Sequence, residues 1–190
     1  MTALIGGFTT PATHSAHAFR GVMTAMARPG TIETLHGAMP PAPLSPAAGA
    51  VLLTLCDADT PLYLAGDTDT TDVRAWVAFH TGAPLTGPET CAFALGRWDA
   101  LLPLSRFSIG TAEYPDRSAT LIVETDRLEA EGATLTGPGI CTTAALSLPG
   151  TGDFRDNHAR FPLGLDFLFT CGGRVAALPR STSISAPKDC

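Results

Sequence analysis

The stretch "LDFLFTCGGRVAALP", residues 165–179, decides the fold that the sequence predicts. It holds two apolar runs that are joined by Gly172 and Gly173. Two short apolar runs around a glycine pair are typical of a β-hairpin with a tight turn. We therefore expect two neighbouring antiparallel strands near the C-terminus.

Upstream of this hairpin, strand-like and helix-like segments alternate. Helical patterns fall at residues 11–28, 50–56, 67–80, 98–104 and 153–162, and strand patterns at 31–36, 62–65, 90–95, 119–125 and 131–137. Such alternation is typical of an α/β layered domain. We expect a layered mixed sheet flanked by helices, in a single domain of residues 1–190 with a proline-rich loop at 37–49 and a flexible tail at 183–190.

The first helix carries most of the candidate site residues. Its apolar spacing predicts one face that packs on the core, made of Phe19, Val22, Met23 and Met26. In the helix at 67–80, Trp76 and Phe79 are expected to face inward. The opposite side of the first helix collects polar and basic residues, namely His14, His17, Arg20, Thr24 and Arg28.

Two interpretations of this basic face stay open. It is either an ordinary solvated helix face or an anion site. In an anion site, Arg20 or Arg28 would make bidentate contacts with phosphate or carboxylate, and His17 would add a donor. His80 ends a helix, where a protonated histidine is stabilised by the helix dipole. Because no acidic residue joins His14 and His17 within the helix, we expect no metal site.

Composition excludes several classes of protein. The formal charge of −6 argues against a nucleic-acid-binding protein. No apolar run approaches the roughly 20 residues that span a bilayer. The N-terminus has no signal-peptide pattern, so we expect a soluble, cytoplasmic protein.

The cysteines and the single lysine argue against a zinc or iron–sulfur site and against lysine-dependent cofactor chemistry. The 5 cysteines are scattered along the chain, which is typical of buried thiols in a reducing compartment and not of a zinc or iron–sulfur site. Lys188, two residues from the C-terminus, is the only lysine, so a buried Schiff-base lysine is not expected. We therefore predict no cofactor.

Five segments together carry a family resemblance. They are "HAFRGVMTAMARPG" (17–30), "LLTLCDADTP" (52–61), "FHTGAPL" (79–85), "LTGPGI" (135–140) and "FPLGLDFLFTCGGRVAALPRST" (161–182). In this order they make the chain similar to the PhnH family of phosphonate-metabolism proteins, subunits of the bacterial carbon–phosphorus lyase core complex. The resemblance extends from about residue 17 to residue 182.

The resemblance implies a function and a fold. Members work with partner subunits to form alpha-D-ribose 1-methylphosphonate 5-triphosphate from ATP and an alkylphosphonate, with release of adenine. Their fold resembles the large domain of PLP-dependent aminotransferases but holds no PLP, and isolated members form homodimers. A two-fold interface is therefore expected.

The same resemblance bears on the candidate residues. His17 and Arg20 lie in a shared motif, so a contact with ATP, with a phosphonate or with another subunit becomes as plausible as a solvated face. Arg28, His80 and Arg180 are further candidates for substrate binding, and Asp166 either orients one of them or has a structural role at the end of a strand. No residue is identified as a catalyst. The alternatives are a structural scaffold with no ligand site of its own, or a free-standing enzyme with a dispersed site.

Overall fold

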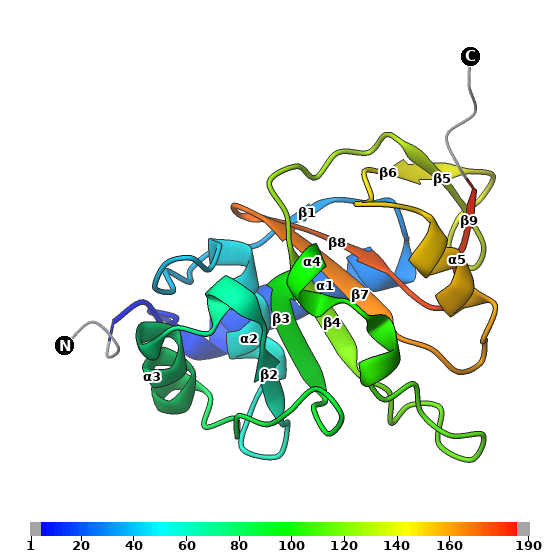
Figure 1. Cartoon of the computed structure of the whole chain (residues 1–190). Helices are drawn as coiled ribbons and strands as arrows, with labels where there is room; N and C mark the ends of the chain where they lie inside the picture. Colours follow the sequence, from blue (N-terminus) through cyan, green and yellow to red (C-terminus); the bar gives the residue numbers. More distant parts are fainter. Residues whose placement is uncertain (1–4, 186–190) are drawn as a thin grey trace.

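A six-stranded mixed sheet forms the centre of the computed structural model, which describes residues 5–185. Its strands follow the order β1-β8-β7-β4-β3-β2 (Figure 1). Strands β2, β3, β4 and β7 are parallel, and β8 and β1 are antiparallel to their neighbours. In sheet order their bounds are Glu33–Thr34, Arg174–Leu178, Asp166–Cys171, Thr120–Glu124, Phe93–Arg97 and Leu62–Leu64. The predicted α/β class with a mixed sheet is confirmed.

The C-terminal hairpin is β7 and β8. Phe167 pairs with Leu178 at the open end, and Cys171 pairs with Arg174 beside the turn. Gly172 occupies the turn at φ +58°, a left-handed conformation that suits glycine because it has no Cβ. The hairpin predicted from residues 165–179 is therefore confirmed.

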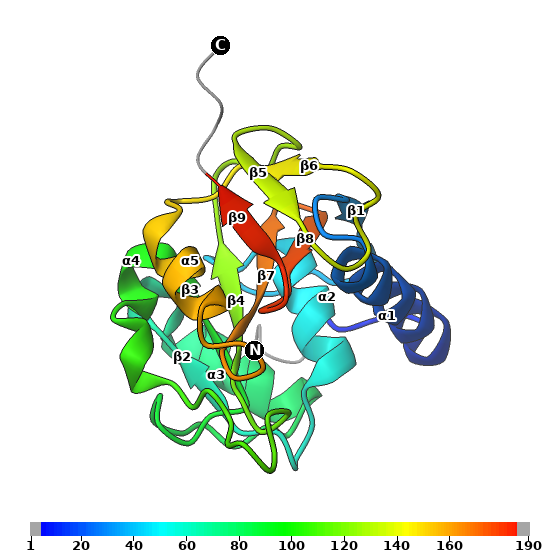
Figure 2. The ribbon, with the colours of Figure 1, turned by 90° about the vertical axis from the view of Figure 1, so that its right-hand side faces the viewer.

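Helices cover both faces of this sheet. On one face lie α1 (Pro11–Ala27), α2 (Pro46–Leu55) and α3 (Thr71–His80), whose buried side chains join one core cluster with Ile122 and Leu168 of the sheet. On the other face lie α4 (Trp98–Leu101), η3 (Leu104–Arg106) and α5 (Gly152–His158), which pack on the side chains of opposite orientation (Figure 2). Successive strand residues point to opposite faces, so both layers are filled from the same strands.

A second, three-stranded sheet lies beside α5. Its order is β6 (Ala144–Leu146), β5 (Ala133–Thr136) and β9 (Ser183–Ser185), all antiparallel. Strand β9 uses residues that the sequence places in a flexible tail, and its Ile184 is buried. Residues 186–190 of that predicted tail lie outside the described residues.

The proline-rich segment ends earlier than the sequence predicts. Helix α2 starts at Pro46, so the last residues of the predicted loop 37–49 are helical. Proline suits the first position of a helix because that N–H has no helical partner. The Oγ of Ser45 accepts a hydrogen bond from the N–H of Ala48 at 3.1 Å and caps the helix.

Two predicted inward faces were wrong in part. In α1 the buried residues are Ala18, Val22 and Ala25, while Phe19 and Met23 are 47% and 53% exposed. The small side chains let α1 approach α2 and β8, which turns the larger ones outward. In α3, Trp76 is buried as predicted, but Phe79 is 58% exposed.

The connection between α1 and β1 positions the helix that carries His17, Arg20 and Arg28. The strand β1 that follows α1 pairs with β8, so α1 is held along the face of the sheet by its own connection. A short 3-10 helix, η2 (Gly66–Thr68), follows β2.

Among the described helices, none has the length and apolar content needed to cross a membrane.

Candidate functional site

Helix α1 presents the predicted cations on its solvent side. His17, Arg20 and Arg28 are all exposed. Within the described part of the chain, no carboxylate forms a salt bridge with any of the three. Residues 5–185 also contain no group of three potential metal ligands. These side chains are therefore available to an external anion or to an acidic protein surface.

His80 lies apart from the candidate residues of α1, at the end of α3. Its ring packs 5.0 Å from the ring of Trp76 and 4.9 Å from that of Phe79. The Nε2 atom is buried and has no hydrogen-bond partner among the described residues. His80 lines a cavity of about 360 Å³ under the N-terminal segment, together with Gly6, Gly7, Phe8, Thr9, Pro11 and Leu53. None of these lining residues is an arginine or a lysine, so the cavity has no permanently charged donor for a phosphate.

Asp166 and Arg180 form an ion pair between the start of β7 and the end of β8. Their side chains are 18% and 13% exposed. Asp166 Oδ1 accepts from the backbone N–H of Arg180 at 2.8 Å and from its Nε at 3.1 Å. The guanidinium also donates to the Pro115 carbonyl at 2.7 Å and to the Ser118 hydroxyl. With its donors engaged in this way, the geometry favours a structural role, and substrate binding by this pair stays a prediction.

A cleft of about 270 Å³ lies where the parallel strands end. The last residues of β3, β4 and β7 meet here with the η2 residues that follow β2, beside the start of α2. In open α/β sheets this carboxyl edge is the usual place for a ligand. The cleft is lined by Pro43, Ser45, Asp67, Thr68, Arg97, Glu124, Thr125, Asp126, Cys171 and Gly172.

The charges of this carboxyl-edge cleft are mostly negative. Arg97 donates to both carboxylate oxygens of Asp126 at 2.9 Å, and its Nε is 3.6 Å from Asp67. The Glu124 carboxylate accepts from the N–H of Ser45 at 2.7 Å and from the Thr170 hydroxyl at 2.9 Å. Burial raises the pKa of Glu124, and these hydrogen bonds partly oppose that rise. The cleft can therefore accept hydrogen bonds from hydroxyl or amino groups, but it repels phosphates.

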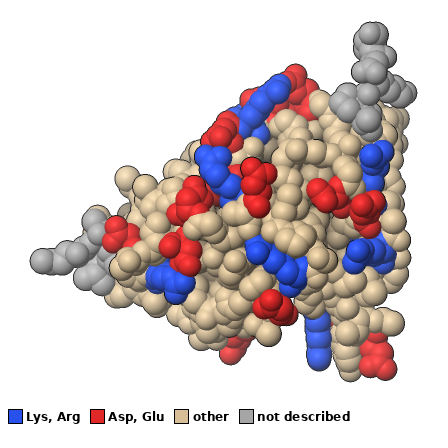
Figure 3. Space-filling view, viewed as in Figure 1, with Lys and Arg blue, Asp and Glu red and all other residues tan. Residues whose placement is uncertain are grey.

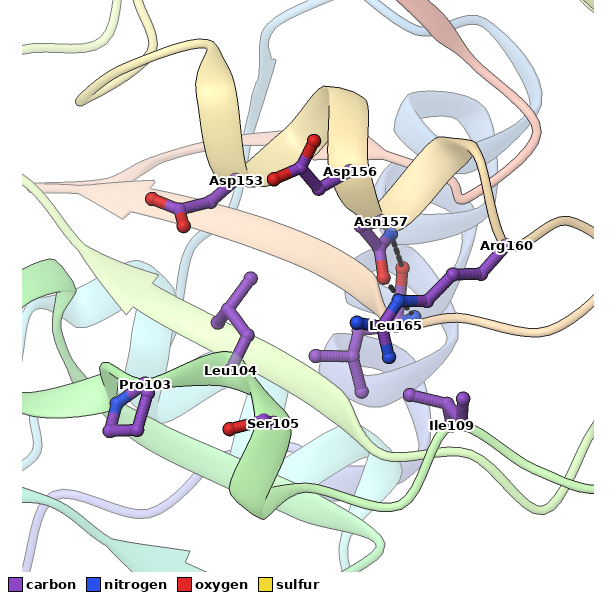
Figure 4. Close-up of a pocket in the computed structure, with 9 residues that line it drawn as sticks. All are labelled: Pro103, Leu104, Ser105, Ile109, Asp153, Asp156, Asn157, Arg160 and Leu165. Carbon is purple, nitrogen blue, oxygen red and sulfur yellow. Dashed lines mark hydrogen bonds between the residues drawn. The ribbon is translucent and has the colours of Figure 1, made fainter.

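A smaller cavity of about 210 Å³ lies between η3 and α5. Figure 4 shows the guanidinium of Arg160 directed toward Leu165 and Asn157. The amide of Asn157 is engaged, since it donates to the Leu165 carbonyl at 2.9 Å and accepts from the Leu165 N–H at 2.8 Å. Two further carboxylates, those of Asp153 and Asp156, line the same cavity. With one guanidinium and two carboxylates, the lining of this cavity has no excess positive charge.

The predicted site residues therefore fall into three separate groups: His17, Arg20 and Arg28 on α1, His80 on α3, and the Asp166–Arg180 pair. None of the described cavities is lined by two of them. The carboxyl-edge cleft was not predicted from the sequence, although its polar residues lie at or just after the ends of predicted strands, and that position was the available signal. On the face that carries α4 and α5, acidic and basic side chains lie next to one another (Figure 3).

Comparisons with known proteins identify the family. A family model described as "Bacterial phosphonate metabolism protein (PhnH)" matches residues 6–185. The chain is 42% identical over 188 residues to "Alpha-D-ribose 1-methylphosphonate 5-triphosphate synthase subunit PhnH" of Rhizobium meliloti (strain 1021), covering 94% of each chain. It is 33% identical over 179 residues to "Putative C-P lyase subunit protein HtxG" of Stutzerimonas stutzeri, covering 88% of this chain and 84% of that protein. The chain belongs to the PhnH family of bacterial phosphonate metabolism proteins.

Proposed function

We propose that this chain is a subunit of the carbon–phosphorus lyase complex in the cytoplasm. With its partner subunits it takes part in forming alpha-D-ribose 1-methylphosphonate 5-triphosphate from ATP and an alkylphosphonate, with release of adenine. The observation that carries this proposal is the similarity to the Rhizobium meliloti synthase subunit over 94% of both chains. The proposal includes a homodimer when the chain is isolated, and a fold related to the large domain of PLP-dependent aminotransferases that works without PLP.

The role supported best within that complex is assembly of the other subunits. A triphosphate or phosphonate needs several converging donors. The carboxyl-edge cleft holds three carboxylates and one ion-paired guanidinium, and the cavity beside α5 holds two carboxylates and one guanidinium. The exposed cations of α1 line none of the described cavities. This distribution supports a subunit that contributes surfaces and leaves the chemistry to its partners.

A second candidate role is anion binding on α1. One observation favours it: Arg20 and Arg28 are exposed and form no salt bridge with any described residue. With His17 on the same helix, they would contact the phosphates of ATP or the phosphonate group.

Reconstitution of the complex with and without this chain tests membership. The measurement is adenine release from ATP in the presence of methylphosphonate. We expect release to depend on the chain, and an equal rate without it would contradict the proposed function.

A thermal shift assay separates the two roles. If α1 binds the anion, millimolar ATP or methylphosphonate should raise the melting temperature of the isolated chain, since a ligand that binds only the folded state stabilises it. Arg20→Ala should remove that shift, whereas Arg155→Ala, at an exposed arginine on α5, should retain it. An unchanged melting temperature in the wild-type chain supports the assembly role.

In either role, Arg20→Ala should reduce adenine release by the reconstituted complex. Its effect on the free energy of unfolding should stay below about 0.5 kcal/mol, because the side chain is exposed and unpaired. Both quantities are measured on the same preparation, by activity assay and by urea unfolding. If the fall in adenine release is fully explained by a fall in the free energy of unfolding, Arg20 is a purely structural residue.

A further inference from the structure

Part of the solvent side of α1 is apolar. Phe19 and Met23, one turn apart, are 47% and 53% exposed. At 100° per residue they share one side of the helix with three exposed alanines. We call this set the outer stripe: Ala12, Ala16, Phe19, Met23 and Ala27. An apolar stripe that faces away from the core on a surface helix marks a contact with another molecule.

The outer stripe is open in the folded chain. Figure 2 shows α1 on the flank of the molecule, with no other element of the described chain on its outer side. The buried side of the same helix is already occupied by Ala18, Val22 and Ala25. The helix thus has two apolar sides, and the fold uses only one of them.

Unpaired cations border this stripe. Arg20 follows Phe19 directly, His17 lies one turn earlier, and Arg28 caps the end of the helix. Residues 11–28 contain no acidic residue, and Glu33 is the first in the chain. In a chain of net charge −6, α1 is therefore a locally positive surface that nothing in the described structure neutralises.

We propose that the outer stripe of α1 docks into an apolar groove on another subunit of the complex, and that carboxylates on the rim of that groove pair with His17, Arg20 and Arg28. A helix that inserts apolar anchors one turn apart into a groove is a common recognition mode. The apolar anchors supply affinity, and the charges supply orientation and speed of association. This inference rests on the proposed function, because it names the surface through which the subunit joins its partners.

Charge decides between a partner subunit and a second copy of this chain. A two-fold dimer brings the same patch of both copies together. Dimerisation through α1 would place the cations of one copy against those of the other, with no acidic residue of either helix to compensate. A different subunit that carries carboxylates fits the surface better.

The test is co-expression of the tagged chain with the other carbon–phosphorus lyase subunits of the same bacterium, followed by affinity purification. The amount of each co-purified subunit is measured by gel densitometry. We expect the double variant Phe19→Ala with Met23→Ala to retain at least tenfold less of the partner subunits than the wild type. Arg20→Glu should have a similar effect, and 0.5 M salt should weaken retention by the wild-type chain.

Matched controls come from the opposite layer of the molecule. Phe161 is 57% exposed near α5, and Arg155 is exposed on α5. Phe161→Ala and Arg155→Glu should retain the partners as the wild type does. Circular dichroism melting of every variant checks the fold, and Arg20→Glu keeps the test valid if the double variant unfolds.

Each outcome separates this inference from the proposed function. If the wild-type chain retains no partner subunit, the proposed function itself is wrong. If the wild type retains them and both α1 variants do so equally well, only the inference is overturned. If the variants convert a wild-type dimer to a monomer while partner retention stays unchanged, the stripe belongs to a second copy, and the inference is again overturned.

Discussion

At the scale of single residues, the ion pair of Arg180 and Asp166 joins segments that are far apart in sequence. The guanidinium contacts Asp166 and also the 115–118 segment, so one side chain holds the ends of the C-terminal hairpin against a surface loop. Because both side chains are largely buried, the loss of either leaves an uncompensated charge.

Asp166→Ala should therefore lower the free energy of unfolding by about 3 kcal/mol, the scale of a broken buried ion pair. Urea unfolding followed by circular dichroism measures it. The matched control is Asp69→Ala, which removes the exposed ion pair with Arg74 and should change stability little. Equal effects of the two substitutions would mean that burial of the Asp166 pair is unimportant.

Glu124 gives a pH-dependent prediction. Burial raises its pKa in the folded chain, so the native state favours the protonated carboxyl and loses stability as the pH rises through that pKa. Glu124→Gln removes this loss. The free energy of unfolding of the variant relative to the wild type should therefore increase as the pH rises from below the ordinary glutamate pKa to neutral, as measured by urea unfolding at each pH. A difference that is independent of pH would contradict the raised pKa.

At the scale of elements, helix starts show where local sequence decides structure. The hydroxyl of Thr70 accepts a hydrogen bond from the N–H of Val73 at 3.1 Å and caps α3, while Thr10, which precedes α1, makes no such bond. Thr70→Ala should cost about 1 kcal/mol of stability. Thr10→Ala is the control and should be nearly neutral. Thermal or urea unfolding compares the two, and similar losses would argue against capping as the cause.

Element types were largely predictable from sequence, and their orientation was not. The glycine pair of the hairpin and the alternation of patterns predicted the mixed sheet correctly, because both are local signals. The inward face of α1 was predicted from its large apolar residues, but alanine and valine fill that face. Strands β6 and β9 have three residues each, too few to show a pattern of their own.

At the scale of the whole molecule, the small sheet and the main sheet share one core cluster. Ile184 of β9 and Leu135 of β5 are buried in the same cluster as Phe167 and Phe169 of β7. The two sheets should therefore unfold together. The carboxyl-edge cleft also exists only at this scale: Asp67 follows β2, while Arg97 and Glu124 end β3 and β4, so only the assembled sheet brings them together.

Ile184→Ala tests this shared core. It should lower the free energy of unfolding by about 3 kcal/mol, the usual cost of removing a buried isoleucine side chain. Tryptophan fluorescence and far-UV circular dichroism should still report one coincident transition. Ser185→Ala, at the exposed neighbour, should change little. Two separate transitions would show that the small sheet unfolds independently.

The edges of the main sheet have a consequence for the chain before it meets its partners. Strand β1 has only two residues, β2 has only three, and the outer side of β2 is bonded to the segment around Leu85. Long unpaired strands invite other chains to add to a sheet and aggregate, and this protein offers neither edge for such addition. Copies that have not yet joined their partners should therefore not aggregate through these sheet edges at high expression. Binding of a partner should depend on which side chains meet, and not on backbone hydrogen bonds between strand edges.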